Sequence, residues 1–453
     1  MPTDPRRPGY HFTVAEGWIN DPLGVTWHRN GDGGRYELFY QLNPDAPVWS
    51  PACRWGQVTS DDLVRWADPR TALEPGPDET GCWSGSVVVD DGVPVIVYTS
   101  VLAESPGLGR IALAQGDPGW RRWIPDPGGP VMGAPPPELG LAHLRDPYVW
   151  RDGEEWRMAV GAGSTDGSPS VLQYSSPDLR RWRSDGVLAR PEPGRPGPGG
   201  AVWECPQLFE LDGAWVLVVS VWDEEPGGVA CAIGDYDGRR FTAHAWHRLA
   251  DVPLYATTVF ADADGRRCAL CWIQEADPAD GVWAGALSVP WLLSRDGDRL
   301  DVRPHPDVET LRTGVRARRG PEALSAEPLL VGALPAHCDV ELHAHPAGEP
   351  LRLTLDDPAG RLLTVVADPR AGEARLLVPG RPDSSAALRS RPDGVLELRL
   401  LVDAGIVEAF AGGGAVAARV RPSGGDLTLG LSAGGDGAGL ERLVVHGMAR
   451  FFG

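Results

Sequence analysis

Three acidic residues of this chain stand in short polar segments that run into apolar stretches. They are Asp21 in Asn20-Asp21-Pro22, Asp146 in Arg145-Asp146-Pro147, and Glu204 in Glu204-Cys205-Pro206. Carboxyl groups can act as nucleophile, proton donor or charge stabiliser, and a pair of them flanking a glycosidic bond is the usual machinery of glycoside hydrolysis. If the three meet in one pocket, retaining glycoside cleavage is the chemistry that they suit.

The spacing of these segments indicates that the carboxyl groups do meet. Asp146 and Glu204 are 58 positions apart, and Asp21 lies 125 positions before Asp146, close to two such steps. We therefore expect Asp146 and Glu204 to occupy equivalent positions in successive structural repeats. Like charges in one pocket raise one another's pKa, so such clustering is more often a functional site than a structural accident.

A second periodic feature defines the repeat itself, namely an arginine followed directly by an aromatic or apolar residue. The second members are Trp66, Trp123, Trp182, Phe241 and Leu300, at a first step of 57 positions and then steps of 59. Repeats of this length are typical of propeller blades of four strands each. The sequence predicts an all-β fold with a five-bladed β-propeller, in which the three tryptophans belong to the blade cores.

Each predicted blade also contains a hairpin signal and a segment near the central axis. Turn sequences rich in Asp, Asn and Gly separate apolar runs near residues 30–33, 90–92, 152–153, 212–213 and 264–265, as hairpin tips do. Trp83–Ser86 and Tyr255–Thr258 complete the series of polar segments. The first strand of a blade lines the channel, so we expect all five segments at one mouth of the channel.

The remainder of the chain has a different pattern. Plain alternation of apolar and polar residues begins after about residue 320, as in Leu351–Leu355 and Val395–Val402, and predicts a C-terminal β-sandwich. We expect the propeller over 1–303, a helix-like or irregular connector over 304–320, and the sandwich over 321–453. The sandwich could be structural, mediate dimerisation or shape a substrate cleft.

Composition excludes several classes of partner. The 42 basic and 62 acidic residues give a net charge of −20, which disfavours nucleic acid and anionic membranes. The chain has no apolar run of the roughly 18 residues that a membrane span needs, and no signal-peptide pattern near its start. We expect a cytoplasmic protein, or a secreted one if a leader was removed, either a monomer or a homodimer.

The cysteines and histidines do not show a metal-binding pattern. Cys268-x-x-Cys271 lacks a second pair of ligands, and His244-x-x-His247 lacks partners at ligand spacing, so we expect buried free thiols. Asp262-x-Asp264-Gly265 resembles the start of a calcium loop, but the later ligands are missing, which favours a solvated turn. The sequence therefore predicts neither a metal nor a cofactor.

An ordered set of motifs resembles glycoside hydrolase family 32, the invertases, levanases and inulinases. The N-terminal part of the set is Trp18–Gly24, Phe39–Pro44, Trp55–Trp66, Trp83–Ser86, Arg145–Pro147, Glu204–Pro206, Gly234–Gly238 and Trp283–Pro290, and Val402–Phe410 follows in the tail. A single tripeptide such as Arg-Asp-Pro is a weak signal, but the ordered set covers nearly the whole chain. The resemblance implies hydrolysis of terminal β-D-fructofuranosyl bonds in sucrose, sucrose phosphate or short fructans.

The resemblance also implies roles for the carboxyl groups. Asp21 would be the nucleophile that forms a covalent fructosyl-enzyme, Glu204 the general acid/base, and Asp146 the residue that stabilises the transition state through the fructose hydroxyls. We expect anionic Asp21 and Asp146 to help Glu204 keep its proton. Arg145 is expected beside Asp146, whose ionised form it would favour. Cys205 has no histidine in its motif to activate it as a nucleophile.

Further residues match positions that contact the sugar in the family. They are Asn20, Gln41, Trp49, Trp83, Ser84, Arg145 and Trp272. Amide and hydroxyl groups can bind ring hydroxyls, and aromatic faces can stack on the C–H surface of a sugar. The resemblance therefore implies a fructoside pocket lined by these side chains.

Departures from the family pattern leave other functions open. The chain has Leu23 where the family usually has asparagine, Pro253-Leu254 where it usually has Asp-Phe, and Trp291 where arginine is common. The changes at Leu23 and Leu254 could favour transfer of fructose to a sugar acceptor instead of water. A non-catalytic carbohydrate-binding propeller, or a related five-bladed enzyme that acts on arabinose or xylose linkages, are the further alternatives.

Overall fold

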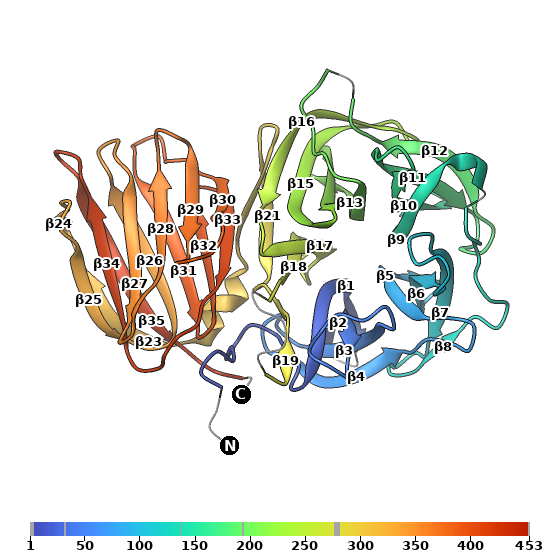
Figure 1. The fold of residues 1–453 in the computed structure, drawn as a ribbon, viewed down its shortest axis with the longest axis horizontal. Coiled ribbons are helices and arrows are strands. Elements are labelled where there is room, and N and C mark those ends of the chain that lie inside the picture. The colour runs from blue at the N-terminus through green and yellow to red at the C-terminus, as the bar shows by residue number, and fades with distance from the viewer. Residues whose placement is uncertain (1–3, 31–32, 136, 193, 276–280, 452–453) are drawn as a thin grey trace.

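The computed structural model describes residues 4–30, 33–135, 137–192, 194–275 and 281–451. These residues form two all-β domains that lie side by side, a five-bladed propeller and a two-sheet sandwich (Figure 1). None of the described residues lies in a helix long and apolar enough to cross a membrane. The predicted fold class, a five-bladed propeller followed by a β-sandwich, is confirmed.

The propeller blades follow one another in sequence order. Blade 1 consists of β1 (Gly17–Asn30), β2 (Gly33–Asn43), β3 (Arg54–Ser60) and β4 (Ala67–Leu73). Blade 2 consists of β5 (Gly81–Asp90), β6 (Val93–Val101), β7 (Arg110–Gly116) and β8 (Trp123–Pro125). Blade 3 follows the short 3-10 helix η1 (Pro137–Leu139) and consists of β9 (Leu141–Asp152), β10 (Glu155–Ser164), β11 (Pro169–Ser176) and β12 (Arg183–Ala189).

The last two blades complete the ring. Blade 4 consists of β13 (Val202–Leu211), β14 (Ala214–Asp223), β15 (Glu225–Tyr236) and β16 (Phe241–Ala250). Blade 5 consists of β17 (Leu254–Ala261), β18 (Arg267–Ile273), β21 (Trp291–Asp296) and β22 (Arg299–Pro304), with β20 (Ala286–Leu287) paired to β18. The short strand β19 (Trp283–Ala284) leaves blade 5 and pairs in parallel with the start of β1. This pairing joins the last blade to the first.

The two sequence periods correspond to the innermost and outermost strands of the blades. The polar segments lie on the first strands β1, β5, β9, β13 and β17, which contact one another around the axis. The arginine-aromatic pairs mark the start of the fourth strand of every blade. Trp66 and Trp123 are buried and Trp182 is partly buried, because these side chains fill the space between neighbouring blades.

Turns connect the first and second strands of blades 2 to 5, as predicted. The turn predicted near residues 30–33 includes residues 31–32, which lie outside the described residues. Asp91-Gly92 and Asp212-Gly213 both have positive φ at each residue, at 47° and 82° and at 49° and 76°. This is the geometry of a two-residue hairpin whose twist matches that of the flanking strands, and Asp-Gly adopts it with little strain. The turn chemistry therefore sets the strand register that leads back to the axis.

The sandwich packs two antiparallel sheets over an aliphatic core. One sheet contains β23 (Arg312–Arg319), β24 (Glu322–Ala323), β26 (His337–His345), β31 (Leu396–Asp403), β32 (Ile406–Ala411), β33 (Gly414–Arg419) and β35 (Gly439–Met448). The other contains β25 (Leu329–Leu334), β27 (Leu351–Asp357), β28 (Gly360–Asp368), β29 (Glu373–Leu377), β30 (Ser384–Ala387) and β34 (Leu427–Ala433). Alternate residues point inward, which accounts for the period of two in the sequence.

The segment predicted as a connector differs in part from the expectation. Residues 306–311 form the 3-10 helix η2 (Pro306–Leu311), which agrees with a helix-like connector. Residues 312–319 instead form β23, which pairs with β35 in the sandwich. This strand contains four arginines, so its sequence does not show the apolar pattern that predicts a strand. It lies at the end of its sheet and pairs along only one side, where charged side chains can remain exposed.

The two domains share a continuous interface. Leu401, Ile406 and Phe410 of the sandwich belong to the same apolar cluster as blades 4 and 5. A buried polar network joins the N-terminal segment to both domains. In this network His11 Nδ1 lies 2.9 Å from Asp403, His11 Nε2 lies 2.8 Å from Glu408, and Glu408 also accepts a hydrogen bond from Trp291 Nε1 at 3.0 Å. The interface therefore holds the sandwich in a fixed position against the propeller.

Candidate active site

A register irregularity interrupts the first strand of every blade at the predicted polar segment. The irregularities fall between Ile19 and Pro22, Trp83 and Gly85, Arg145 and Tyr148, Glu204 and Gln207, and Tyr255 and Thr258. Residues in such bulges leave the ladder of backbone pairing, so their side chains can be redirected. The five bulges place their polar residues at one end of the channel.

The bulges of blades 3, 4 and 5 also show which residues are structurally equivalent. Asp146, Cys205 and Ala256 each have a left-handed backbone, with φ of 63°, 46° and 50°. Arg145, Glu204 and Tyr255 each precede that residue as the last paired position. The expectation that Asp146 and Glu204 are equivalent is therefore wrong, since Glu204 corresponds to Arg145, one repeat of 59 positions earlier. Left-handed non-glycine residues are strained and concentrate at functional sites.

One cavity of about 470 Å³ gathers every residue that the sequence predicted for the site. The predicted residues that line it are Asn20, Asp21, Gln41, Trp49, Trp83, Ser84, Arg145, Asp146, Glu204 and Trp272. They come from all five blades, so the cavity lies at the mouth of the channel. The position of these side chains agrees with the sequence analysis, and their individual roles stay predictions.

Asp21 is buried at the base of this arrangement and accepts two side-chain contacts on one oxygen. Ser84 Oγ donates to Asp21 Oδ2 at 2.5 Å, and Cys205 Sγ lies 3.5 Å from the same oxygen. Burial raises the pKa of Asp21 to about 6, an effect that the Ser84 hydrogen bond opposes and the charge of Glu204 reinforces. Asp21 is therefore mainly ionised at neutral pH, as a nucleophile must be.

Glu204 is held by two side chains from neighbouring blades. Arg145 Nε donates to Glu204 Oε1 at 2.7 Å, and the Tyr255 hydroxyl donates to Glu204 Oε2 at 2.5 Å. Arg145 acts on the charge of Asp146, as expected, and its side chain also extends to blade 4, where it binds Glu204. Burial and the charge of Glu204 raise the pKa of Tyr255 well above its usual value, so its hydroxyl stays a donor.

Asp146 lies between the other two carboxyl groups. The backbone N–H of Cys205 donates to Asp146 Oδ2 at 3.1 Å, and the N–H of Asp146 donates to Thr99 Oγ1 at 2.8 Å. Burial and the charge of Glu204 raise the pKa of Asp146 to about 7, although Arg145 acts in the opposite direction. Burial also raises the pKa of the Cys205 thiol, which therefore stays protonated and is a poor nucleophile.

The predicted sugar contacts divide into anchored and unpartnered groups. Gln41 Nε2 donates to the carbonyl of Cys82, and Trp83 Nε1 donates to the carbonyl of Pro51. Trp49 is 54% exposed and meets Trp83 edge to face with ring centroids 6.1 Å apart. Within the described chain, Asn20 Oδ1 and Trp272 Nε1 are buried without a hydrogen-bond partner. Both atoms are available to a bound hydroxyl group.

Eight further residues line the cavity without having been assigned to it from the sequence, namely Trp18, Pro106, Gly107, His143, Trp222, Pro226, Tyr255 and Glu275. Tyr255 and Trp18 stand in motifs quoted above, and His143 lies two positions before Arg145 on the same strand, so its position was recoverable from the period of two. Trp222 lies near the end of β14 and Glu275 follows β18, and no motif marks either residue. Trp18 Nε1 donates to Glu275 Oε1 at 2.7 Å, which places this carboxylate at the edge of the cavity.

The departures from the family pattern lie away from the cavity. Leu23 packs in the core between blades 1 and 2, and Leu254 packs in the core shared by blades 4 and 5 and the sandwich. Trp291 is fully buried and donates to Glu408 of the sandwich. None of these residues is among those that line the cavity, so the argument that Leu23 and Leu254 favour transfer has no direct contact to support it.

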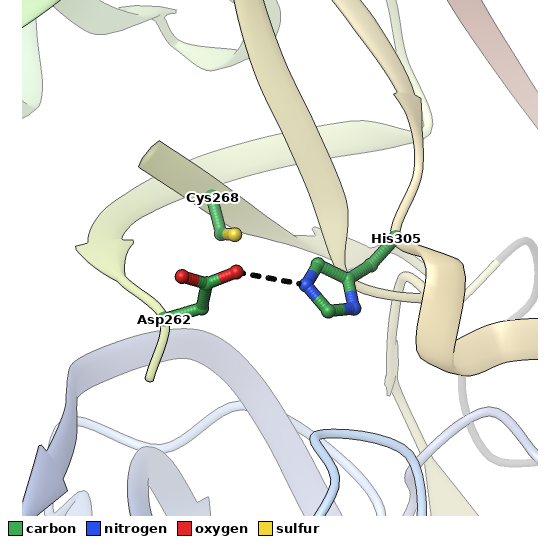
Figure 2. A group of neighbouring side chains, drawn as sticks. All are labelled: Asp262, Cys268 and His305. Carbon is green, nitrogen blue, oxygen red and sulfur yellow. Dashed lines mark hydrogen bonds and ion pairs between the residues drawn. The ribbon is translucent and has the colours of Figure 1, made fainter. Parts of the chain in front are cut away.

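One group of potential metal ligands occurs among the described residues, formed by Asp262, Cys268 and His305, whose ligand atoms lie within 4.8 Å of one another (Figure 2). His305 Nε2 lies 3.1 Å from Asp262 Oδ2, and Arg266 Nε donates to the same oxygen at 2.6 Å. Burial raises the pKa of Cys268 to about 12. Arg266 donates to the Asp262 oxygen that a cation would bind, and a guanidinium at that position does not fit a cation site.

The position of Asp262 also corrects the sequence analysis. The turn at Asp262–Gly265 is present, with the N–H of Gly265 donating to the carbonyl of Asp262 at 3.0 Å. Residues 263–265 of this turn are exposed, as predicted for a solvated turn, but the Asp262 side chain itself is buried. The prediction for the cysteines is confirmed, since all seven are buried and free.

Comparisons with known proteins agree with this geometry. Residues 11–304 match the glycosyl hydrolases family 32 N-terminal domain, and residues 372–447 match the C-terminal region of the same family. A raffinose invertase of Escherichia coli is 31% identical, with 94% of this chain and 92% of the relative covered. A sucrose-6-phosphate hydrolase of Escherichia coli is 29% identical, with 92% and 89% covered.

Solved structures support the same assignment. A mutant of a Bombyx mori β-fructofuranosidase in complex with sucrose matches with a TM-score of 0.81 and 26% identity, over 99% of this chain and 95% of that chain. An exo-inulinase from Aspergillus awamori matches in fold with a TM-score of 0.84 and 21% identity, over 99% of each chain. The matched domains, their order and the carboxylate cavity lead to one conclusion. The chain belongs to glycoside hydrolase family 32 and is a hydrolase of the β-fructofuranosidase type.

Proposed function

We propose that this protein hydrolyses the terminal β-D-fructofuranosyl bond of sucrose or short fructans with retention of configuration. The observation that carries the proposal is the single cavity in which Asp21, Asp146 and Glu204 meet, together with the predicted sugar contacts. Two carboxyl groups suffice for retaining hydrolysis, and a third can bind fructose hydroxyls. The family assignment supports the type of bond that is cleaved.

The proposed reaction has two steps that conserve protons. An oxygen of Asp21 attacks the anomeric carbon of fructose while Glu204 donates a proton to the departing oxygen, which leaves as the free sugar. In the second step Glu204 accepts a proton from a water molecule, and the oxygen of that water attacks the anomeric carbon. The bond between fructose and Asp21 breaks, and fructose is released. The contacts from Arg145 and Tyr255 hold Glu204 in one orientation for both steps.

The charges around the cavity favour a neutral substrate over a phosphorylated one. Four carboxyl groups line the cavity, from Asp21, Asp146, Glu204 and Glu275, and Arg145 is already paired with Glu204. Burial and the charge of Arg145 lower the pKa of His143, which leaves it neutral. A phosphate group would meet these carboxyl groups, and Arg145 is the single arginine among the described lining residues. Several relatives are sucrose-6-phosphate hydrolases, so sucrose phosphate is the substrate to compare.

The test compares sucrose, raffinose, a fructan trisaccharide and sucrose 6-phosphate with the wild-type enzyme and with Asp21→Ala and Glu204→Ala. We expect fructose release from the neutral substrates with the highest kcat/KM for sucrose, and loss of activity in both variants. Proton NMR of the first product formed should show the β-anomer of fructose. Release of the α-anomer, or a preference for the phosphorylated sugar, would refute the corresponding part of the proposal.

The same assay separates hydrolysis from transfer. An enzyme that hydrolyses releases glucose and fructose from sucrose in equal amounts, whereas a transferase releases an excess of glucose at high sucrose concentration. The positions of Leu23 and Leu254 in blade cores remove the argument for transfer. We therefore expect a ratio close to one.

A further inference from the structure

A second, smaller cavity of about 150 Å³ lies where blade 5 meets the sandwich. Gln274 and Glu275, which follow β18, line its propeller side, and Ser384 of β30 and Arg419 of β33 line its sandwich side. Pro253 and Leu376 supply apolar surface. Glu275 also lines the fructoside cavity, so the two cavities share this residue.

Buried polar atoms without partners are concentrated in this second cavity. Among the described residues, such atoms include Gln274 Nε2, Glu275 Oε2, Ser384 Oγ and Arg419 Nη1, and each belongs to a residue that lines the cavity. A buried polar atom left without a hydrogen bond is unfavourable, because it has lost its hydrogen bonds to water and gained none in their place. Four such atoms around one space indicate that a polar molecule completes their hydrogen bonds.

The two charged residues of this cavity, Glu275 and Arg419, each contact a tryptophan outside it. Glu275 Oε1 accepts a hydrogen bond from Trp18 Nε1, and the Arg419 guanidinium lies over the Trp283 ring at 5.3 Å from its centroid. No ion pair joins Glu275 to Arg419 in the part of the chain that the structure describes. Burial raises the pKa of Glu275 and lowers that of Arg419 to about 10, and the attraction between the two charges offsets these shifts only in part.

The mixture of donors and acceptor selects the class of ligand. An oxyanion would face the Glu275 carboxylate, and a cation would face Arg419. A hydroxyl group can donate to Glu275 Oε2 and accept from Arg419 Nη1 or Gln274 Nε2, and apolar surface suits the C–H face of a sugar. Arg381 also lines the cavity but has an interaction of its own. At ~30 Å³ for each water, the space corresponds to about five waters, which suits a single sugar ring.

We infer that this interdomain cavity is a second carbohydrate site, which binds one neutral hexose separately from the fructoside cavity. The site goes beyond the proposed function and does not depend on it, because none of its atoms takes part in bond cleavage. Its contact with Glu275 connects it to Trp18, which lines the fructoside cavity.

Glucose binding to the full-length protein, measured by calorimetry, provides the test. We expect Ser384→Ala and Gln274→Leu to weaken glucose binding at least tenfold. Ser385→Ala is the matched control, because the neighbouring Ser385 contacts Asp251 at 3.4 Å and does not line the cavity. Equal loss in Ser385→Ala, or loss in Trp49→Ala but not in the cavity variants, would overturn the inference.

The thermal stability of the same variants separates ligand binding from a structural role. Each substitution removes a buried polar atom that has no partner, so neither should lower the Tm of the sugar-free protein. Glucose should raise the Tm of the wild type but not that of the variants. A lower Tm without sugar would show that the atoms serve the fold. A crystal soaked in glucose that holds only water in this cavity would also overturn the inference.

Discussion

Arg145 and Glu204 occupy the same position in successive blades, and a 2.7 Å hydrogen bond joins their side chains between these two neighbouring blades. The repeat has therefore placed a guanidinium and a carboxyl group at equivalent sites and turned them toward each other. A shared backbone position with different side chains is how a repeat architecture can build an asymmetric site. The consequence is that Glu204 is oriented by blade 3 as well as by its own blade.

Arg145→Gln should reduce kcat/KM about 100-fold, because a hydrogen bond between charged groups contributes about 1.5–3 kcal/mol. It should also raise the pKa of Asp146 above about 7, since Arg145 favours the ionised carboxylate. Kinetics against pH will measure both effects. Arg157→Gln is the control, because Arg157 pairs with Asp152 and Asp185 on blade 3, away from the cavity. A loss no larger than in the control would contradict the orienting role.

Ser84→Ala should move the acidic limb of the kcat/KM profile upward by about one pH unit. The hydroxyl of Ser84 donates to ionised Asp21, so its removal raises the pKa of Asp21 above about 6. Less nucleophile is then ionised at neutral pH. Ser86→Ala is the control and should leave the limb unchanged. Ser86 lies two residues further along the same strand, where its hydroxyl accepts a hydrogen bond from the N–H of Val149. An unshifted limb in Ser84→Ala would rule out Asp21 as the group that titrates.

The stability of the domain interface should fall as the pH rises from 6.5 to 9. Burial alone would lower the pKa of His11, but its hydrogen bonds to Asp403 and Glu408 raise that pKa to about 9. A raised pKa of this kind contributes stability that is complete below the unfolded value of about 6.5 and is lost as pH passes through 9. The shift corresponds to about 3 kcal/mol.

The measurement compares urea unfolding of the wild type and His11→Gln at pH 6 and pH 9.5. The stability difference between them should shrink at the higher pH. His244→Gln is the control, because its contacts with Asp235 and Asp298 are exposed and contribute little.

At low pH, Asp403 is the group of this network whose protonation matters. Hydrogen bonds from His11 and His337 outweigh burial and lower the pKa of Asp403, so its contribution is lost only when strong acid protonates it.

Trp49→Ala should raise KM about tenfold with little change in kcat. Trp49 is half exposed at the edge of the cavity against Trp83, so it can contact the leaving sugar without touching the reacting atoms. A loss of about 1.4 kcal/mol of binding corresponds to that factor. Ile124→Ala removes an equally exposed side chain on the outer strand of blade 2 and should leave KM unchanged. A fall in kcat instead would assign Trp49 to the chemical step.

Leu23→Asn restores the residue usual in the family and should destabilise the protein by about 1–3 kcal/mol, because it buries an amide in an apolar core. The ratio of transfer to hydrolysis should not change. Leu113→Asn, in the same kind of core on β7, should show a similar loss of stability. An altered product ratio in Leu23→Asn alone would connect this core position to the acceptor site.

Periodicity and turn chemistry are sufficient to identify the repeats, the hairpins and the three acids at the channel mouth, whereas the seven sugar-contact residues were assigned through the family resemblance. Residues such as Asp91-Gly92 specify their turn through their own backbone preferences, and the alternation of β27 and β28 depends on neighbours in sequence. The family motifs add a further signal, because whole segments of this chain resemble those of the family in the same order. None of these signals depends on which side chains meet across the channel.

What the sequence determined by itself was therefore the number of blades, the inner and outer strands and the acids at the channel mouth, because each follows from spacing along the chain. Tertiary structure decided that Arg145 reaches Glu204, that Leu23 and Trp291 are buried away from the substrate, that Asp262 is enclosed, and that residues 312–319 join the sandwich. Each of these depends on contacts between segments far apart in the chain, and such contacts form only when the blades close into a ring and the sandwich packs against it.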